Sequence, residues 1–381
     1  MASNQVIILA IDGGGIRGII PAYILSQIEK QTNKQSYQLF DIIGGTSTGG
    51  ILTAGLTSIT PLRNQYPLTA DMLLKLYQQN GDNIFVAQNA DLHATYYADD
   101  GNGHGVEPYL QNMLGTSLLS QAQNAVRSLP FTRVKQAFTT GYIVNSTGNT
   151  VTNPIPGQDY GPYLFNWYSA ARNAADNYYV WEAARGTSAA PTYFPIACVG
   201  GNTGPRSNAA QRWVVDGGTM SNNPAMWALT EAFRLGLAQS LSDITLISLG
   251  TGVYPGACGA GIHTNYAFDC PDNGDWSETP WVVDNMYDLQ GNRSRGLMIN
   301  VILDAVQQVS GNQLAAMRAG GLNYYRLEPV IPQSMAAMDN ITPQNITNLT
   351  NAAINYVSGA GAVVFNKVIT ALQNSAVLEN V

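Results

Sequence analysis

The chain repeats one local plan twice, in which a short apolar strand is followed by a glycine-rich turn and a helical pattern. In the first copy, the apolar run Val6–Ile11 precedes three glycines at 13–15, and Pro21 opens a helical pattern. In the second copy, a strand over 40–43 precedes a glycine-rich turn at 44–50 and another helix start. Units of this kind build a mostly parallel sheet covered by helices, so the sequence predicts an α/β fold.

The remaining chain continues this pattern without an internal repeat or a dividing linker. Thr342 and the proline after it form a clear helix start. Strands are predicted over 138–144, 213–215 and 244–249, and helices over 51–56, 70–79, 181–185, 225–235, 342–357 and 363–372. We expect one domain over 1–381, with a core at about 6–330, an irregular, lid-like region at about 84–127, a surface loop at about 252–280 and a helical segment at about 340–375.

Composition excludes several classes of function. Hydrophobic residues make up 45% of the 381 residues, which is enough for a sizeable core, and charged residues only 11%, against about 25% in an average protein. The formal net charge is −7 and no long basic run occurs. A nucleic-acid partner is therefore not expected, and neither is purely electrostatic binding to an anionic membrane.

The cysteines and the apolar runs indicate the cellular compartment in which the protein is expected. The three cysteines, Cys198, Cys258 and Cys270, form no C-x-x-C pair, so no structural zinc site is expected. Cys258 and Cys270 share a glycine-rich segment and would pair only in an oxidising compartment; free thiols are the favoured interpretation. The first apolar run is too short for a signal peptide, and none reaches the roughly 18 residues of a membrane span. We expect a cytoplasmic protein without a transmembrane segment.

The motif Gly-Thr-Ser-Thr-Gly at residues 45–49 matches the G-x-S-x-G nucleophile elbow, with Ser47 at its centre. A strand precedes it and a helix follows, as the elbow requires. A sharp turn of this kind exposes the serine, and the flanking glycines relieve crowding. The helix N-terminus then offers N–H groups to a developing oxyanion. Ser47 is the candidate nucleophile.

The glycine-rich loop at residues 12–18 can collect backbone N–H groups at one point, which is typical of an anion-binding nest. Gly13, Gly15 and Gly18 also satisfy the G-x-G-x-x-G spacing of dinucleotide-binding loops, but no acidic residue follows at a suitable strand end. A P-loop is excluded because no Lys-Ser/Thr pair follows the glycines. A nucleotide-binding protein is therefore the weaker alternative to a loop that serves Ser47.

A serine nucleophile needs a proton acceptor, and two kinds of residue compete for that role. The chain has only three histidines, of which His93 and His104 lie in the irregular region and His263 in the later loop. Only His263 fits the order of an α/β-hydrolase triad, and it follows no strand. Asp216 ends an apolar strand and precedes two glycines, the place where open α/β sheets carry their sites. Asp216 is therefore the favoured base.

The order of these motifs resembles the patatin-like phospholipases. The resemblance rests on residues 12–18, 45–50 and 216–218, together with the Arg-Gly-Thr-Ser-Ala-Ala-Pro-Thr-Tyr-Phe block ending at Phe194 and Asn-Asn-Pro at 222–224. It covers about residues 6–250 and is weaker in the helical tail. It implies a three-layer α/β/α fold and a serine–aspartate dyad in place of a triad.

The resemblance also implies roles for individual residues. Ser47 would be the nucleophile, Asp216 the base and Gly13–Gly15 the oxyanion hole. Arg17 and Thr48 are candidates for supporting roles. Arg17 could steer a phosphate head group or pair with a carboxylate to hold the loop, and the structural role is favoured. The block around Arg185 is interpreted as architectural. The implied reaction is hydrolysis of phospholipids or related acyl lipids at a membrane or micelle surface, with no metal or cofactor. The alternative is a non-catalytic storage or lipid-binding protein on the same fold.

Overall fold

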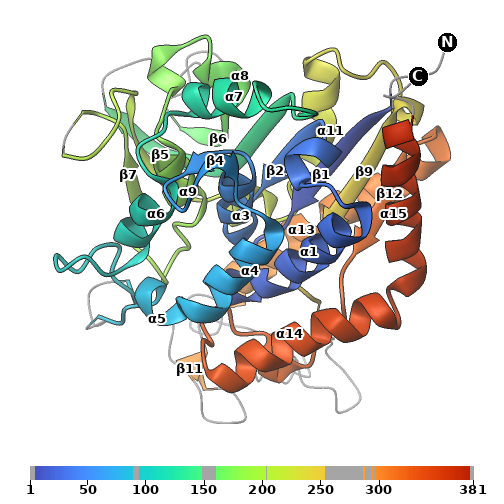
Figure 1. Cartoon of the computed structure of the whole chain (residues 1–381). Coiled ribbons are helices and arrows are strands. Elements are labelled where there is room, and N and C mark those ends of the chain that lie inside the picture. The colour runs from blue at the N-terminus through green and yellow to red at the C-terminus, as the bar shows by residue number, and fades with distance from the viewer. Residues whose placement is uncertain are drawn as a thin grey trace.

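The computed structural model describes residues 5–88, 94–147, 160–202, 204–253, 286–287, 293–294 and 297–377. Within these ranges one sheet has eight strands in the order β12-β9-β1-β2-β5-β8-β7, and β6 also pairs with β5 (Figure 1). Its strands are β1 (Val6–Ile11), β2 (Ile42–Gly45), β5 (Gln136–Thr147), β6 (Gly161–Asn166), β7 (Ala197–Val199), β8 (Gln211–Asp216), β9 (Ile244–Leu249) and β12 (Asn323–Leu327). The short ribbons β3 (Ile59–Thr60) with β4 (Arg63–Pro67) and β10 (Met286–Tyr287) with β11 (Arg293–Ser294) lie outside it.

Helices cover both faces of this sheet. They are α1 (Ile19–Thr32), α2 (Ser36–Leu39), α3 (Thr48–Leu56), α4 (Ala70–Gln79), α5 (Gly81–Ile84), α6 (Val106–Leu114), α7 (Leu119–Arg127), α8 (Trp167–Ala170), α9 (Val180–Thr187), α10 (Gly218–Ser221), α11 (Ala225–Arg234), α13 (Leu297–Met317), α14 (Pro343–Ser358) and α15 (Ala362–Val377). Short 3₁₀ turns include η1 (Gly15–Gly18), directly before α1. The expected α/β fold with a mostly parallel central sheet is confirmed.

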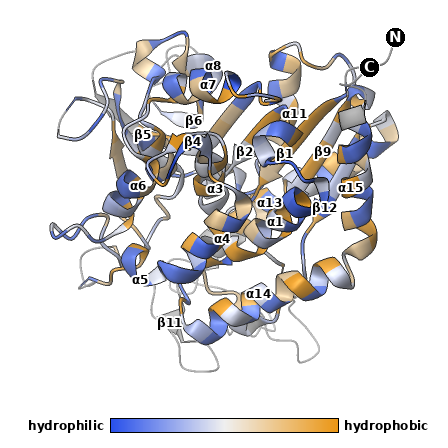
Figure 2. Ribbon diagram, in the orientation of Figure 1, coloured by the Kyte–Doolittle hydropathy of each residue, from blue (hydrophilic) through white to orange (hydrophobic). Residues whose placement is uncertain are grey.

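The apolar composition of β1 follows from burial on both faces. Ile7, Leu9 and Ile11 join the larger core cluster, under α1, α3 and α4. Ile8 joins a second cluster, with side chains of α11 and α13. The sequences of parallel strands that are covered on both faces are continuously apolar and do not alternate between apolar and polar residues. The central strands are accordingly coloured orange, for hydrophobic residues, in Figure 2.

The two strands that end at the candidate residues meet end to end. On β5, residues 138–139 pair with both β2 and β6, and residues 141–143 pair with both β6 and β8. Because a strand has only two edges, β2 and β8 share the edge opposite β6. Gly45 ends opposite Thr139 and Asp216 ends opposite Gly141, so the two carboxyl ends point toward each other about 7 Å apart.

Most predicted elements are present with small shifts, but three strands of the eight-stranded sheet and both two-stranded ribbons were not predicted. β1, α4 and β9 have the predicted bounds, and the Thr342 side chain caps α14 as expected. The sequence analysis did not predict β6, β7 or β12. Strand β7 has only three residues, and β6 and β12 mix polar, charged or aromatic residues with few aliphatic ones. The irregular region at 84–127 contains α6 and α7, of which α6 packs against α9. The predicted loop at 252–280 lies outside the described residues apart from its start.

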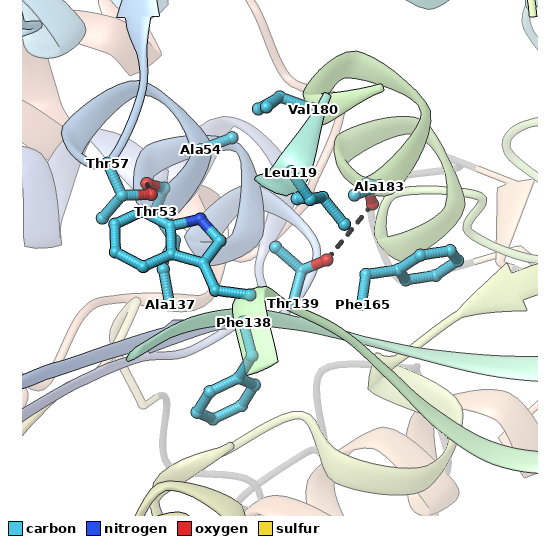
Figure 3. A pocket seen from close by; sticks show the side chains of 11 residues that line it. Thr53, Ala54, Thr57, Leu119, Ala137, Phe138, Thr139, Phe165, Val180 and Ala183 are labelled. Carbon is cyan, nitrogen blue, oxygen red and sulfur yellow. Dashed lines mark hydrogen bonds between the residues drawn. The ribbon is translucent and has the colours of Figure 1, made fainter. Parts of the chain in front are cut away.

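Helices α3 and α9 pack closely over β5. A cavity of about 20 Å³ remains between them, lined by Thr53, Thr139 and apolar neighbours (Figure 3). That is room for about one water molecule. The Thr139 hydroxyl donates to the Ala183 carbonyl at 3.3 Å and so holds α9 on the strand. The end of α9 is thereby fixed beside the start of α3.

In the part of the chain that the structure describes, no single helix combines the length and apolar composition of a membrane span. Only the consecutive helices α14 and α15, bent by 73° at the break between them, reach both criteria when counted together.

Candidate active site

Ser47 stands at the sharp turn between β2 and α3. Its backbone angles, φ 53° and ψ −122°, lie where residues with a Cβ are rarely found. The turn is close enough that a Cβ on Gly45 would lie 2.0 Å from the Gly49 carbonyl oxygen, and one on Gly49 would lie 2.1 Å from the Ile11 oxygen. The glycines of the motif are therefore required by space, and the side chain of Ser47 remains partly exposed.

Asp216 ends β8 beside this turn, where the Ser47 side chain lies close enough to lower the pKa of its carboxyl. The N–H of Gly218 donates a hydrogen bond to Oδ1 at 2.7 Å. Asp216 is only 4% exposed. Burial raises the pKa of its carboxyl to about 7, although the Gly218 hydrogen bond, the Ser47 side chain and the charge of Arg185 oppose this shift. The sequence-predicted nucleophile and base thus lie beside each other at the facing ends of β2 and β8.

The glycine-rich loop lies against the same turn. A Cβ on Gly13 would lie 3.1 Å from the Ser47 Cβ. The N–H of Gly13 already donates to the Asn222 carbonyl at 3.1 Å. Among the described residues no acceptor is present for the N–H groups of Gly14 and Gly15. Of the three glycines expected to form the oxyanion hole, Gly13 therefore has its N–H paired within the fold, whereas those of Gly14 and Gly15 are unpaired within the described residues.

An ion-pair network that the sequence did not reveal anchors this loop. The guanidinium of Arg326 in β12 donates two bonds, of 2.9 and 2.6 Å, to the fully buried carboxylate of Asp12. Arg326 also pairs with Glu328 at 2.8 Å. Burial lowers the pKa of Arg326, but the carboxylates of Asp12 and Glu328 outweigh burial and hold it above its ordinary value. More than 300 residues separate Arg326 from Asp12, so spacing could not indicate the pair.

The two residues expected to support the site both make structural contacts. Arg17 is buried, and its side chain donates to the carbonyls of Gly14 and Gly252 at 3.3 and 3.2 Å. The Thr48 hydroxyl bonds the hydroxyl of Tyr77 in α4 and packs against Gly18. These contacts hold the glycine-rich loop and the first turn of α3 in place.

The histidines and cysteines considered in the sequence analysis lie away from Ser47 or outside the described residues. His104 lies in an exposed turn, where its ring contacts Asp100 at 3.0 Å. His93, His263, Cys258 and Cys270 lie outside the described residues, so their predicted roles stay predictions. Cys198 is a free thiol. Within the described ranges, no three His, Cys, Asp or Glu side chains gather in a way that could hold a metal ion.

Comparison with known proteins identifies the family of this chain. The family model for patatin-like phospholipases matches residues 9–229, which include the loop, the elbow and Asp216. Patatin-like protein 2 of Oryza sativa subsp. indica is 26% identical over 91% of this chain and 82% of its own length. Patatin-03 of Solanum tuberosum is 31% identical over 74% of this chain and 67% of its own.

A further relative carries a different description. The probable inactive patatin-3-Kuras 1 of Solanum tuberosum is 32% identical over 65% of this chain and 63% of its own length. Similarity to patatins therefore does not by itself establish catalysis, and the chemistry of this chain has to be argued from its own residues. The family match covers more than half of the chain and includes every motif of the site. This chain belongs to the patatin-like phospholipases, a family of lipid acyl hydrolases.

Proposed function

We propose that this protein hydrolyses carboxylic esters of phospholipids or related acyl lipids through an acyl-enzyme on Ser47, with Asp216 as the base. The observation that carries the proposal is that a partly exposed serine at a strained turn lies beside a buried carboxylate with a pKa of about 7. A strained serine beside a tuned base is the arrangement that nucleophilic catalysis needs. No histidine takes part in the proposed reaction.

In the acylation step, the Asp216 carboxylate takes the proton of the Ser47 hydroxyl while Oγ forms a bond to the ester carbonyl carbon. The carbonyl π-bond electrons move to oxygen and give a tetrahedral oxyanion. When the intermediate collapses, the ester C–O bond breaks and the alcohol leaves with the proton held by Asp216. The product of this half-reaction is an ester between the acyl group and Ser47.

The oxyanion would be held by N–H groups of the glycine-rich loop. Gly14 and Gly15 are the favoured donors, because the N–H of Gly13 is already used by Asn222. In comparable sites one such donor contributes roughly 3–4 kcal/mol to the barrier reduction. The bonds from Arg326 to Asp12 and from Thr251 to the Gly13 carbonyl, the latter 2.7 Å long, keep this loop in one geometry.

In the second step, Asp216 takes a proton from water as the water oxygen attacks the acyl carbon. The intermediate collapses, Ser47 recovers a proton from Asp216, and the fatty acid leaves. The same carboxyl group therefore serves as base and acid in both halves. A group with a pKa near 7 suits this double role, because both protonation states are accessible near neutral pH.

The rate of ester hydrolysis is expected to depend on the ionisation of Asp216. The base must be ionised in the free enzyme, so kcat/KM should fall about tenfold per pH unit below about 7 and level off above it. The measurement is a pH–rate profile between pH 5 and 9 with a soluble p-nitrophenyl ester. A profile that stays flat down to pH 5 would exclude Asp216 as the base.

The function itself is tested with a substrate panel. Wild-type protein should release fatty acid from p-nitrophenyl butyrate and from at least one of phosphatidylcholine, a galactolipid or a diacylglycerol in mixed micelles, with EDTA present. Hydrolysis that requires a divalent cation would contradict the proposal. Inactivity on every ester, combined with saturable binding of lipid, would favour a non-catalytic lipid-binding protein. Titration with labelled nucleotide would test the alternative that the glycine-rich loop binds a nucleotide.

A further inference from the structure

One short segment contacts the backbone of both candidate catalytic residues. The segment comprises residues 187–189, at the end of α9 and just beyond it. The N–H of Ser47 donates to the Thr187 hydroxyl oxygen at 2.9 Å. The N–H of Asp216 donates to the Ala189 carbonyl at 3.0 Å. Two residues of one segment thus hold the two peptides whose side chains react.

The segment is itself firmly held. Thr187 is fully buried, and a Cβ on Gly50 would lie 2.5 Å from its methyl carbon, so the methyl group packs on the first turn of α3. The Ser188 hydroxyl donates to the Ala184 carbonyl at 2.8 Å. Arg185, also fully buried, pairs with Glu107 in α6 at 3.2 Å. The segment is therefore packed on α3 and bonded to α9, which is itself held to α6 through Arg185.

The contact with Ser47 matters because of the strain at the turn. A residue with φ 53° and ψ −122° keeps this conformation only when its surroundings enforce it. The elbow glycines permit the turn but do not direct the peptide of Ser47. A buried N–H also needs an acceptor, and Thr187 supplies it.

We propose that Thr187 is a positioning residue that, together with the carbonyl of Ala189, sets the distance between the Ser47 hydroxyl and the Asp216 carboxylate. This inference rests on the proposed function. Thr187 touches neither substrate nor reacting atoms and acts through the backbone of Ser47. Reactive groups that are misplaced by a fraction of an ångström lose rate, while binding of the substrate is affected much less.

The test is Thr187→Val, which keeps the shape and the methyl group of the side chain but removes the acceptor. We expect kcat for p-nitrophenyl butyrate to fall about 10- to 100-fold, with KM changed less than about threefold. The Ser47 side chain lowers the pKa of Asp216, so moving it away should shift the acid limb of the pH–rate profile to higher pH. Labelling of Ser47 by a fluorophosphonate should become slower but still reach completion.

Two matched variants separate positioning from stability. Thr187→Ser keeps the acceptor and loses the methyl group, so its kcat and acid limb should return close to wild type even if its melting temperature falls. Thr53→Val makes the same chemical change in α3, at a buried hydroxyl for which the described residues offer no partner. It should leave kcat, the acid limb and the labelling rate unchanged.

The outcomes distinguish this inference from the proposed function. In an active enzyme, a Thr187→Val variant with wild-type kcat overturns the inference alone. If kcat fell equally in Thr187→Val and Thr187→Ser and the acid limb of the pH–rate profile did not move, the role of Thr187 would be packing. That result would also overturn the inference. A wild-type protein that neither cleaves esters nor takes the label would remove the proposed function, and the inference with it.

Discussion

Ser47→Ala is expected to reduce ester hydrolysis to background, a loss of roughly 10⁵- to 10⁶-fold in kcat. The substitution removes the only atom that forms the proposed covalent bond, while the glycines that shape the turn remain. Alanine tolerates the turn at φ 53° no worse than serine does, so the fold should be retained. The measurement is release of p-nitrophenol and of fatty acid under the conditions used for wild type.

Labelling provides the matched readout for this variant. Wild-type protein should take up one fluorophosphonate group per chain, and Ser47→Ala none, with both variants giving the same circular dichroism spectrum. A nearby threonine variant, Thr53→Val, should be labelled like wild type. If Ser47→Ala kept measurable turnover, or if the label were found on another serine, Ser47 would not be the nucleophile.

Asp216→Asn is expected to lower kcat by about 10³- to 10⁴-fold with little change in the shape of the site. The asparagine oxygen can still accept the N–H of Gly218, now 2.7 Å from Oδ1, but the amide cannot take the proton of Ser47. Adding Ser47→Ala to this variant should cost little further activity, because the two groups act as one unit. Full activity in Asp216→Asn would place the base elsewhere, and His263 would be the next residue to replace.

The same substitution should stabilise the folded protein at neutral and alkaline pH. Burial raises the pKa of Asp216 in the fold to about 7, from about 4 in an unfolded chain. The folded state therefore favours the protonated carboxyl, and this contribution to stability is lost as pH rises from about 4 through 7. Above pH 7 the ionised group costs on the order of 4 kcal/mol, which Asp216→Asn should recover.

Thermal unfolding at two pH values tests this sign. At pH 8 the melting temperature of Asp216→Asn should exceed that of wild type, and the gap should narrow as pH falls toward 5. A wild type that is more stable than the variant at pH 8 would mean that the carboxylate is better paired in the fold than its burial indicates. Higher stability combined with lost activity is the pattern expected of a functional buried charge.

Strands, helix starts and the glycine-rich turn could largely be predicted from the sequence, because short-range steric requirements determine them. The apolar run of β1, the caps of α14 and the glycines at 45 and 49 each satisfy a requirement within a few residues. The G-x-S-x-G motif identified Ser47 because only a glycine-flanked turn leaves room for the Gly49 and Ile11 carbonyls. The residues themselves also indicated Asp216 as the base and the glycine-rich loop as an anion-binding nest, and the family resemblance implied the same roles.

The direction of β8 relative to its neighbours in the sheet could not be predicted from the sequence. We expected Asp216 and Ser47 to meet because both follow strands whose carboxyl ends share one edge of a parallel sheet. In the structure β8 runs antiparallel to β5 and meets β2 end to end along it. The two residues lie beside each other, but for a different reason, since strand direction depends on pairing between segments distant in the chain.

The sequence by itself determined the α/β class, the turn that carries Ser47 and the places where only glycine fits. Tertiary structure alone decided the roles of Arg326, Asn222 and Thr187, which hold Asp12, the N–H of Gly13 and the N–H of Ser47. The physical reason is that a sterically required turn is enforced by its own neighbours. A buried polar group, in contrast, takes its partner from whichever segment the fold brings beside it.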